Sequence, residues 1–431
     1  MDSGKKYLWL PGLPLPSLEP HSEAKHHLFR AYLNAYVNRL TRRPEQDRLR
    51  LTVVDGFCGG GAYAGPKGAV VPGSPMILLD EAAAAEAAVR AERTKGFEFA
   101  VDFVFVDADE THCAVLSEQI AKSAHADKLG RTVSITRGTF AEAYGSIEAG
   151  IKGRRGKRRT LFFLDQYGYS DVPLALVRRI LTNLEGAEVI LTFAIDALIN
   201  YLSDTERFAK AVQPVELTPP QILELMRLWE SDETGGRYVV QNALFRHVRR
   251  VTGAPYSSPF FIRSHVSNRA YWLVHLSKHH TARDVMGEIH WEVQNSSLHY
   301  GREGLISLGF DAAHLGPSLP FEFDRDARDR SMRRVNAEAP RLIFDAAQRQ
   351  GAPIRFEDFH AGLCSHTPVT RRMLEQRLLA MKAEGEIDIV DANGKPRRGP
   401  KVDWDDRLAR PKAPSLFSLW NPGTRNPLGR G

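Results

Sequence analysis

A glycine-rich stretch after a short apolar run carries the clearest chemical signal in the chain. The run Leu49–Val54 ends at Asp55, and the sequence continues Gly-Phe-Cys-Gly-Gly-Gly to residue 61. Glycines at the carboxyl end of a parallel strand let the backbone approach a ligand closely. We therefore expect ligand contacts from five residues of this stretch: Asp55, Gly56, Phe57, Gly59 and Gly61.

The length of this loop indicates the class of ligand. No Gly-Lys-Ser or Gly-Lys-Thr follows, which excludes a nucleotide P-loop. Residues 59–64 fit a loose GxGxxA dinucleotide pattern, but that fingerprint needs a helix beginning within it. Here Pro66 and Pro72 delay the helix to Ser74. A long loop suits a nucleoside joined to an amino acid, such as S-adenosylmethionine, and glycines that serve only the tight turn are the alternative.

Two later positions would complete such a site. Asp107 ends the second apolar run, where a carboxylate accepts hydrogen bonds from ribose hydroxyls. The alternative is a turn residue, with Asp109 capping the following helix, and both roles are compatible. Phe140 follows the third run, where its ring would either cover a purine or belong to the core.

Asp165 and Tyr167 are the catalytic candidates. They follow the fourth apolar run in Leu-Asp-Gln-Tyr-Gly-Tyr, residues 164–169. This segment resembles the Asp-Pro-Pro-Tyr element of amino-methylating DNA enzymes, which accepts from the target amine and stacks the base. Both prolines are missing here, so the atom that would be methylated stays open.

Apolar strands alternate five times with helical patterns between residues 49 and 193. This alternation predicts an α/β fold with a parallel, doubly wound, Rossmann-like methyltransferase sheet, in a domain over residues 1–310. Residues 203–255 are predicted to be a helical insertion. Three later segments are predicted as edge strands, the first two forming an antiparallel hairpin: residues 260–263, 271–276 and 289–293.

A second, smaller domain is predicted near the C-terminus. Residues 311–337 are charged and interrupted by prolines, which is typical of a linker. Residues 338–402 show three helical patterns followed by a hairpin, as in a winged helix-turn-helix. Residues 403–431 are predicted to be a Pro-rich tail.

Positive charge is concentrated in this second domain. The chain has 58 Lys and Arg against 52 Asp and Glu, a net charge of +6, and residues 338–431 hold 16 against 12. Five cations lie where a recognition helix and a wing contact bases and phosphates: Arg371, Arg372, Lys395, Arg397 and Arg398. We therefore expect a nucleic-acid partner, DNA in preference to RNA, and a protein-interaction module is the alternative. A basic run at residues 152–159 precedes the fourth strand, so it is either a phosphate contact far from the reacting atom or a solvated loop.

Three other classes of site are excluded or not supported. Cys58, Cys113 and Cys364 are far apart without CxxC spacing, which excludes a disulfide framework and favours a reducing, cytoplasmic compartment. The histidines lack the Cys or carboxylate spacing of a metal site, so no metal is predicted. No apolar run reaches the ~18 residues that a membrane span needs.

Several of these motifs together resemble the three-Cys-motif partner proteins. They are Lys25-His26 in a predicted helix, the glycine-rich stretch with a later Gly-Ser-Pro at residues 73–75, the acidic end of the second strand, Leu-Asp-x-Tyr-Gly-Tyr, and the segment Tyr271–Glu292. The resemblance covers residues 20–300 and implies a methyltransferase-like Rossmann fold. It also implies a partner protein that carries a three-cysteine, radical-SAM-like motif. Family members usually have Asp-Pro-Tyr-Gly where this chain has Asp-Gln-Tyr-Gly at residues 165–168.

Three functions are consistent with these residues. The first is an S-adenosylmethionine-dependent methyltransferase acting on nucleic acid, with the cofactor across residues 55–61 and Asp107 and the target group at Asp165. The second is a non-catalytic DNA-binding partner protein that keeps the fold without the chemistry. The third is a nicotinamide-linked oxidoreductase, which the delayed helix disfavours.

Overall fold

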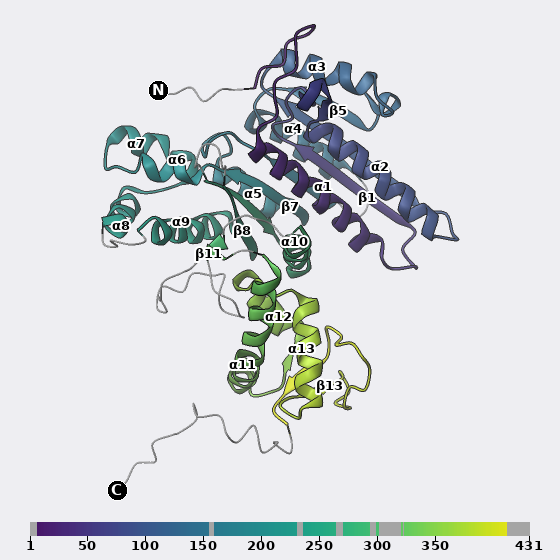
Figure 1. The fold of residues 1–431 in the computed structure, drawn as a ribbon, viewed down its shortest axis with the longest axis vertical. Coiled ribbons are helices and arrows are strands. Elements are labelled where there is room, and N and C mark those ends of the chain that lie inside the picture. Colours follow the sequence, from purple (N-terminus) through teal and green to yellow (C-terminus); the bar gives the residue numbers. More distant parts are fainter. Residues whose placement is uncertain are drawn as a thin grey trace. The chain divides into compact units, whose positions relative to one another are not determined.

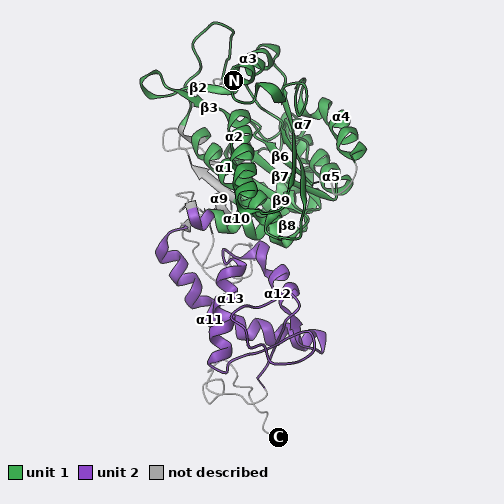
Figure 2. Cartoon of the chain, turned by 90° about the vertical axis from the view of Figure 1, so that its right-hand side faces the viewer, with its two compact units in different colours: residues 1–289 green, residues 290–431 purple. Residues whose placement is uncertain are grey.

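The chain forms two compact units in a computed structural model that describes residues 7–154, 159–230, 236–263, 270–293, 299–300, 320–321 and 323–411. Unit 1 is Met1–Ile289 and unit 2 is His290–Gly431 (Figure 2). The sequence places the end of the first domain at residue 310, whereas the compact units divide after Ile289. No described helix is long and apolar enough to cross a membrane.

Within the described part of unit 1, seven strands form one sheet in the order β5-β4-β1-β6-β7-β9-β8. They are β1 (Arg48–Asp55), β4 (Glu98–Asp107), β5 (Val133–Arg137), β6 (Arg159–Leu164), β7 (Gly186–Phe193), β8 (Tyr256–Arg263) and β9 (Ala270–Ser277). The first five of this sheet order are parallel, whereas β9 is antiparallel to both β7 and β8. The predicted α/β class, the parallel sheet and the edge hairpin are therefore confirmed.

Helices cover both faces of this sheet. Phe29 of α1 (Pro20–Thr41) packs against Phe163, with ring centroids 4.7 Å apart, and Phe140 of α4 (Phe140–Gly153) packs against Phe162 at 6.2 Å. Because neighbouring residues of a strand point to opposite faces, α1 and α4 must lie on opposite sides of β6. The helices before β7 are α1 (Pro20–Thr41), α2 (Ser74–Glu92), α3 (Glu110–Ala121), α4 (Phe140–Gly153) and α5 (Leu174–Asn183). Helices α1 and α2 pack side by side (Figure 1).

The segment after β7 is helical, as predicted for residues 203–255. It contains α6 (Ile195–Asn200), α7 (Glu206–Ala211), α8 (Pro219–Glu230) and α9 (Gly236–Thr252), and α10 (His280–Val293) follows β9. The prediction of a strand at residues 289–293 is wrong, because these residues end α10. Val285, Met286 and Ile289 are buried at helical spacing, which a short apolar run does not reveal.

Unit 2 combines helices with a small antiparallel sheet. Its helices are α11 (Arg325–Gln350), α12 (Phe356–Leu363) and α13 (Arg371–Ala383), and β12 (Ile354–Arg355), β14 (Arg407–Ala409) and β13 (Asp388–Val390) pair in that order. A separate ribbon joins β10 (His299–Tyr300) to β11 (Pro320–Phe321). The predicted linker is wrong for residues 325–337, which form the first half of α11. There the buried residues Ala327, Ser331 and Val335 recur every four positions beneath the charged face.

The small sheet also extends beyond the predicted end of the second domain at residue 402. Strand β14 lies within the segment predicted as a Pro-rich tail, yet it pairs with both β12 and β13. Its middle residue, Leu408, is fully buried. Residues 412–431 of the predicted tail lie outside the described residues.

Candidate functional site

Three acidic side chains meet at the carboxyl edge of the parallel strands in unit 1. Asp55 ends β1, Asp107 ends β4, and Asp165 directly follows β6, and these strands are neighbours in the order β4-β1-β6. The chain order reverses here, since β4 and β5 lie on one side of β1 and β6 and β7 on the other. In open α/β sheets such a switch point is where ligands bind. The residues expected from the sequence at the ends of strands one, two and four are therefore brought together.

The glycine-rich loop is tied to both neighbouring strands by its backbone. The N–H of Gly56 donates to the carbonyl of Phe163 at 2.9 Å, and the N–H of Cys58 donates to that of Val106 at 3.0 Å. A Cβ on Gly56 would lie 2.7 Å from the side chain of Leu164. At this position a glycine is therefore required by packing inside the protein.

Asp107 shapes the same loop. Its carboxylate accepts hydrogen bonds from the backbone N–H groups of Gly59 at 3.0 Å and Asp109 at 2.9 Å, and Nδ1 of His112 lies 3.1 Å away. Asp109 caps α3 by accepting from the N–H of Thr111. The cap expected as the alternative for Asp109 is thus present. Asp107 joins the loop to the end of β4.

The N-terminal arm, residues 7–19 before α1, covers this loop, which the sequence did not predict. Trp9 is 4% exposed, and its indole N–H donates to the carbonyl of Ala62 at 2.6 Å. A Cβ on Gly59 would lie 2.7 Å from the Trp9 ring, and one on Gly60 would lie 2.3 Å from it. The absence of a side chain at these two glycines therefore leaves room for the indole ring of Trp9. The aromatic residues of an arm otherwise rich in proline were the only signal for this contact in the sequence.

Asp55 is a buried carboxyl with an unsatisfied oxygen. It is 1% exposed, and Oδ1 accepts from the N–H of Phe57 at 3.1 Å, while Oδ2 makes no hydrogen bond of standard geometry among the described residues. Burial raises the pKa of Asp55 to about 7, against the nearby hydroxyl of Ser74 and the N–H of Phe57, which both lower it. A cationic ligand group would supply the missing partner, so this residue fits the ammonium of an amino-acid moiety.

Asp165 is paired with a lysine from α1. The ammonium of Lys25 lies 2.7 Å from Oδ1, with side-chain exposures of 8% for Lys25 and 21% for Asp165. Burial alone would raise the pKa of Asp165, but the charge and hydrogen bond of Lys25, together with smaller contributions from the Thr192 hydroxyl and His26, lower it. Asp165 therefore enters the site as a carboxylate that can accept a hydrogen bond.

The residues beside Asp165 differ in their exposure. Gln166 is buried, and its Oε1 accepts from the N–H of Val172 at 2.9 Å, so this side chain holds the loop after β6 in shape. Tyr167 is 52% exposed, which leaves its ring available to an incoming group. Phe140 is 1% exposed and packs in the core, so its ring does not present an open surface.

The basic residues predicted to bind nucleic acid have different environments in unit 2. The guanidinium of Arg371 lies 4.1 Å from the centroid of the Trp404 ring and donates to the carbonyl of Val402. Arg397 pairs with Asp406 at 2.7 Å and also with Asp403. These two cations therefore make contacts within the unit. The other three predicted contacts are exposed to solvent: Arg372, Lys395 and Arg398.

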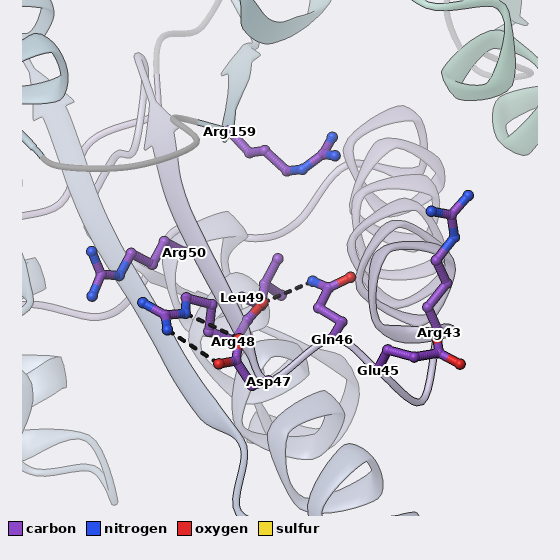
Figure 3. Close-up of a pocket in the computed structure, with 8 residues that line it drawn as sticks. All are labelled: Arg43, Glu45, Gln46, Asp47, Arg48, Leu49, Arg50 and Arg159. Carbon is purple, nitrogen blue, oxygen red and sulfur yellow. Dashed lines mark hydrogen bonds and ion pairs between the residues drawn. The ribbon is translucent and has the colours of Figure 1, made fainter.

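A cavity of about 580 Å³ lies at the other edge of the sheet, where β1 and β6 begin (Figure 3). Four arginines and four other residues line it: Arg43, Glu45, Gln46, Asp47, Arg48, Leu49, Arg50 and Arg159. Arg159 ends the predicted basic run 152–159, whose residues 155–158 lie outside the described residues. Arg154 pairs with Asp102, and Lys152 pairs with Glu148. The described part of this run is thus remote from Asp165, as predicted.

No protein-family model and no curated protein matches the chain. Among solved structures, the O-methyltransferase from Bacillus cereus in complex with SAH is 10% identical, over 62% of this chain and 84% of that chain, with a TM-score of 0.30. Trm1 from Pyrococcus horikoshii with S-adenosyl-L-methionine is 12% identical, over 94% and 95%, with a TM-score of 0.30. Human methyltransferase 10 domain containing protein is 8% identical, over 58% and 83%, with a TM-score of 0.26. These likenesses are distant.

Proposed function

We propose that unit 1 is an S-adenosylmethionine-dependent methyltransferase domain that acts on nucleic acid. The observation that carries the proposal is the meeting of Asp55, Asp107 and Asp165 with a glycine-rich loop at the switch point of the sheet. Asp107 would bind the ribose hydroxyls, and the unsatisfied Oδ2 of Asp55 would pair with the ammonium of the methionine moiety. The cofactor supplies a methyl group on a sulfonium, which is electrophilic.

Asp165 and Tyr167 would act on the methyl-accepting group. The accepting nitrogen or oxygen would take the methyl group from the sulfonium, leaving the neutral thioether, and the proton of the accepting atom would leave to solvent. The carboxylate of Asp165 would accept a hydrogen bond from this atom and orient its lone pair toward the methyl group. The exposed ring of Tyr167 would stack on the base that carries it.

Unit 2 would present the substrate. Its three helices and small sheet in the order β12-β14-β13 would act as a winged helix-turn-helix, with α13 as the recognition helix. Arg372, Lys395 and Arg398 are the exposed cations for phosphates and bases, and DNA is the proposed substrate ahead of RNA. A protein with a three-cysteine, radical-SAM-like motif is the proposed partner.

The second candidate is a DNA-binding partner protein that does not catalyse methyl transfer. It is favoured by Gln166, which replaces a proline of the methylating element and uses its side chain to hold the loop after β6. Under this proposal the acidic residues at the sheet edge would keep a structural role only.

Calorimetry and methyl transfer separate these functions. We expect S-adenosylmethionine and S-adenosylhomocysteine to bind the wild type and NAD not to bind. The Asp107→Ala variant should bind both S-adenosyl compounds more weakly. Transfer of labelled methyl to duplex DNA, to RNA and to protein is then measured with the wild type and Asp165→Asn. Cofactor binding without transfer to any acceptor would support the second candidate. No binding of the methyl donor would overturn the methyltransferase proposal.

A further inference from the structure

Lys25 reaches the candidate site from a helix 140 residues earlier in the chain. It lies in the second turn of α1, and its ammonium is 2.7 Å from Oδ1 of Asp165. The lysine is nearly buried, at 8% side-chain exposure, whereas Asp165 keeps 21%. The ion pair is thus placed between the packed interior and the open edge of the sheet, with the carboxylate on the open side.

A buried lysine is unusual unless it is paired, because an ammonium removed from water loses its hydration. The same holds for the carboxylate, whose burial favours the neutral acid. The ammonium of Lys25 therefore favours the ionised form of Asp165. If Lys25 lost its charge, the burial of Asp165 would be unopposed by the nearest cation, and the carboxyl would take up a proton at a higher pH.

The other titratable groups around Asp165 do not replace this lysine. His26 is buried beside it, and burial lowers the pKa of His26 to about 4, so its imidazole is neutral at neutral pH. Tyr7 and Tyr63 face the carboxylate from the arm and from β2 (Ala62–Ala64), and burial raises the pKa of both phenols. Asp55, at the end of β1, adds negative charge only as it ionises, since burial raises its pKa to about 7. Lys25 is therefore the cation that sets the charge of Asp165.

We propose that Lys25 is a positioning residue for methyl transfer, which holds Asp165 as an oriented carboxylate facing the methyl-accepting group. The proposal rests on the proposed function of unit 1. Lys25 contacts neither substrate nor cofactor and acts through Asp165. A lysine with only a structural role would support the packing of α1. In that case its replacement would not change how the rate of methyl transfer depends on the protonation of Asp165.

The test compares Lys25→Met, which keeps an unbranched side chain of similar length without the charged end, with Lys25→Arg, which keeps the charge. Lys95→Met is the matched control, since Lys95 is exposed in a loop. Single-turnover transfer of labelled methyl to duplex DNA is measured against pH at saturating S-adenosylmethionine. In parallel, ¹³C NMR of labelled aspartate carboxyls follows the signal that is lost in Asp165→Asn.

We expect Lys25→Met to move the acid limb of the rate profile and the NMR titration upward together by about one pH unit or more. We also expect its maximal rate to fall by about 100-fold, because the carboxylate loses its fixed orientation. Lys25→Arg should restore the limb, and Lys95→Met should match the wild type. Superimposable profiles of Lys25→Met and wild type would overturn the proposal, as would an NMR shift without a change in rate.

Two further measurements keep this result interpretable. Lys25→Met combined with Asp165→Asn removes both charges, so circular dichroism and cofactor calorimetry on this variant show whether the fold tolerates the site without the pair. A double variant that binds the cofactor while Lys25→Met is slow supports the proposal. A wild type that transfers no methyl group overturns the proposed function of unit 1, whereas an active wild type with an unaffected Lys25→Met overturns the role of Lys25 alone.

Discussion

The indole of Trp9 donates a hydrogen bond of 2.6 Å to the carbonyl of Ala62, directly after the three consecutive glycines. The ring also lies edge-on to His112, 4.9 Å between centroids, and His112 contacts the carboxylate of Asp107. The arm, the glycine-rich loop and the proposed ribose-binding acid therefore form one packed cluster. A substitution in any one of these three parts should therefore change the packing of the other two.

Gly60→Ala tests this cluster. Gly60 does not have a positive φ, so alanine is compatible with its backbone, but its Cβ would lie 2.3 Å from the Trp9 ring. We expect the indole to be displaced, the free energy of unfolding to fall by about 1–3 kcal/mol, and tryptophan emission to shift to the red. Gly145→Ala is the control, because Gly145 is exposed in α4 with no atom near its Cβ position. Equal stability and emission in Gly60→Ala and the wild type would contradict the prediction.

The sequence was sufficient for the sheet and for the acids at the ends of its strands, because buried parallel strands are continuous apolar runs and their polar ends mark the edge. The sequence did not predict the packing of Trp9 against Gly60 or the ion pair between Lys25 and Asp165. These contacts join residues that local periodicity cannot connect. The same limit applies to Arg371, whose place at the start of a helix was predicted. Its use in packing depends on Trp404, in a segment predicted as tail.

Cofactor affinity should depend on pH through Asp55. Burial places the pKa of Asp55 at about 7, above its ordinary value, so the carboxyl gains a proton as the pH falls through 7. Protonation removes the charge that would pair with the ammonium of the cofactor. We expect S-adenosylmethionine to bind more weakly below about pH 7 than above it, measured by calorimetry across this range.

Asp55→Asn provides the control for that measurement. The variant cannot ionise at this position, so its affinity should be lower at neutral pH and should lose the dependence near pH 7. Stability gives a second readout with a defined sign. Because the folded-state pKa is raised from 3.8 to about 7, the folded wild type binds more protons than the unfolded chain between these values, and it loses stability relative to Asp55→Asn as the pH rises from about 4 to about 7. Parallel stability curves for the two proteins would contradict the prediction.

Tyr32→Phe should destabilise unit 1 without affecting the candidate site. The hydroxyl of Tyr32 in α1 donates to Glu188 of β7 and lies 3.0 Å from Nε2 of His275 in β9, and all three residues are buried. Removing the hydroxyl leaves Glu188 with one partner fewer, at a cost of about 1–3 kcal/mol. Urea unfolding measures the loss, and Tyr201→Phe at an exposed position should be neutral. A stability of Tyr32→Phe equal to that of the control would show that this network contributes little.

The exposed cations of unit 2 should determine the salt dependence of DNA binding. Arg372, Lys395 and Arg398 are exposed, so each is available to a phosphate. Their combined replacement by glutamine should make the slope of log affinity against log salt less steep by about three, because each phosphate contact releases about one counterion. Anisotropy of a labelled duplex over a series of salt concentrations measures the slope.

The matched control replaces three exposed arginines of α11 by glutamine: Arg328, Arg341 and Arg349. We expect the control to keep the wild-type slope. If the first variant also keeps it, unit 2 does not hold DNA through these residues, and the protein-interaction alternative for this unit is favoured.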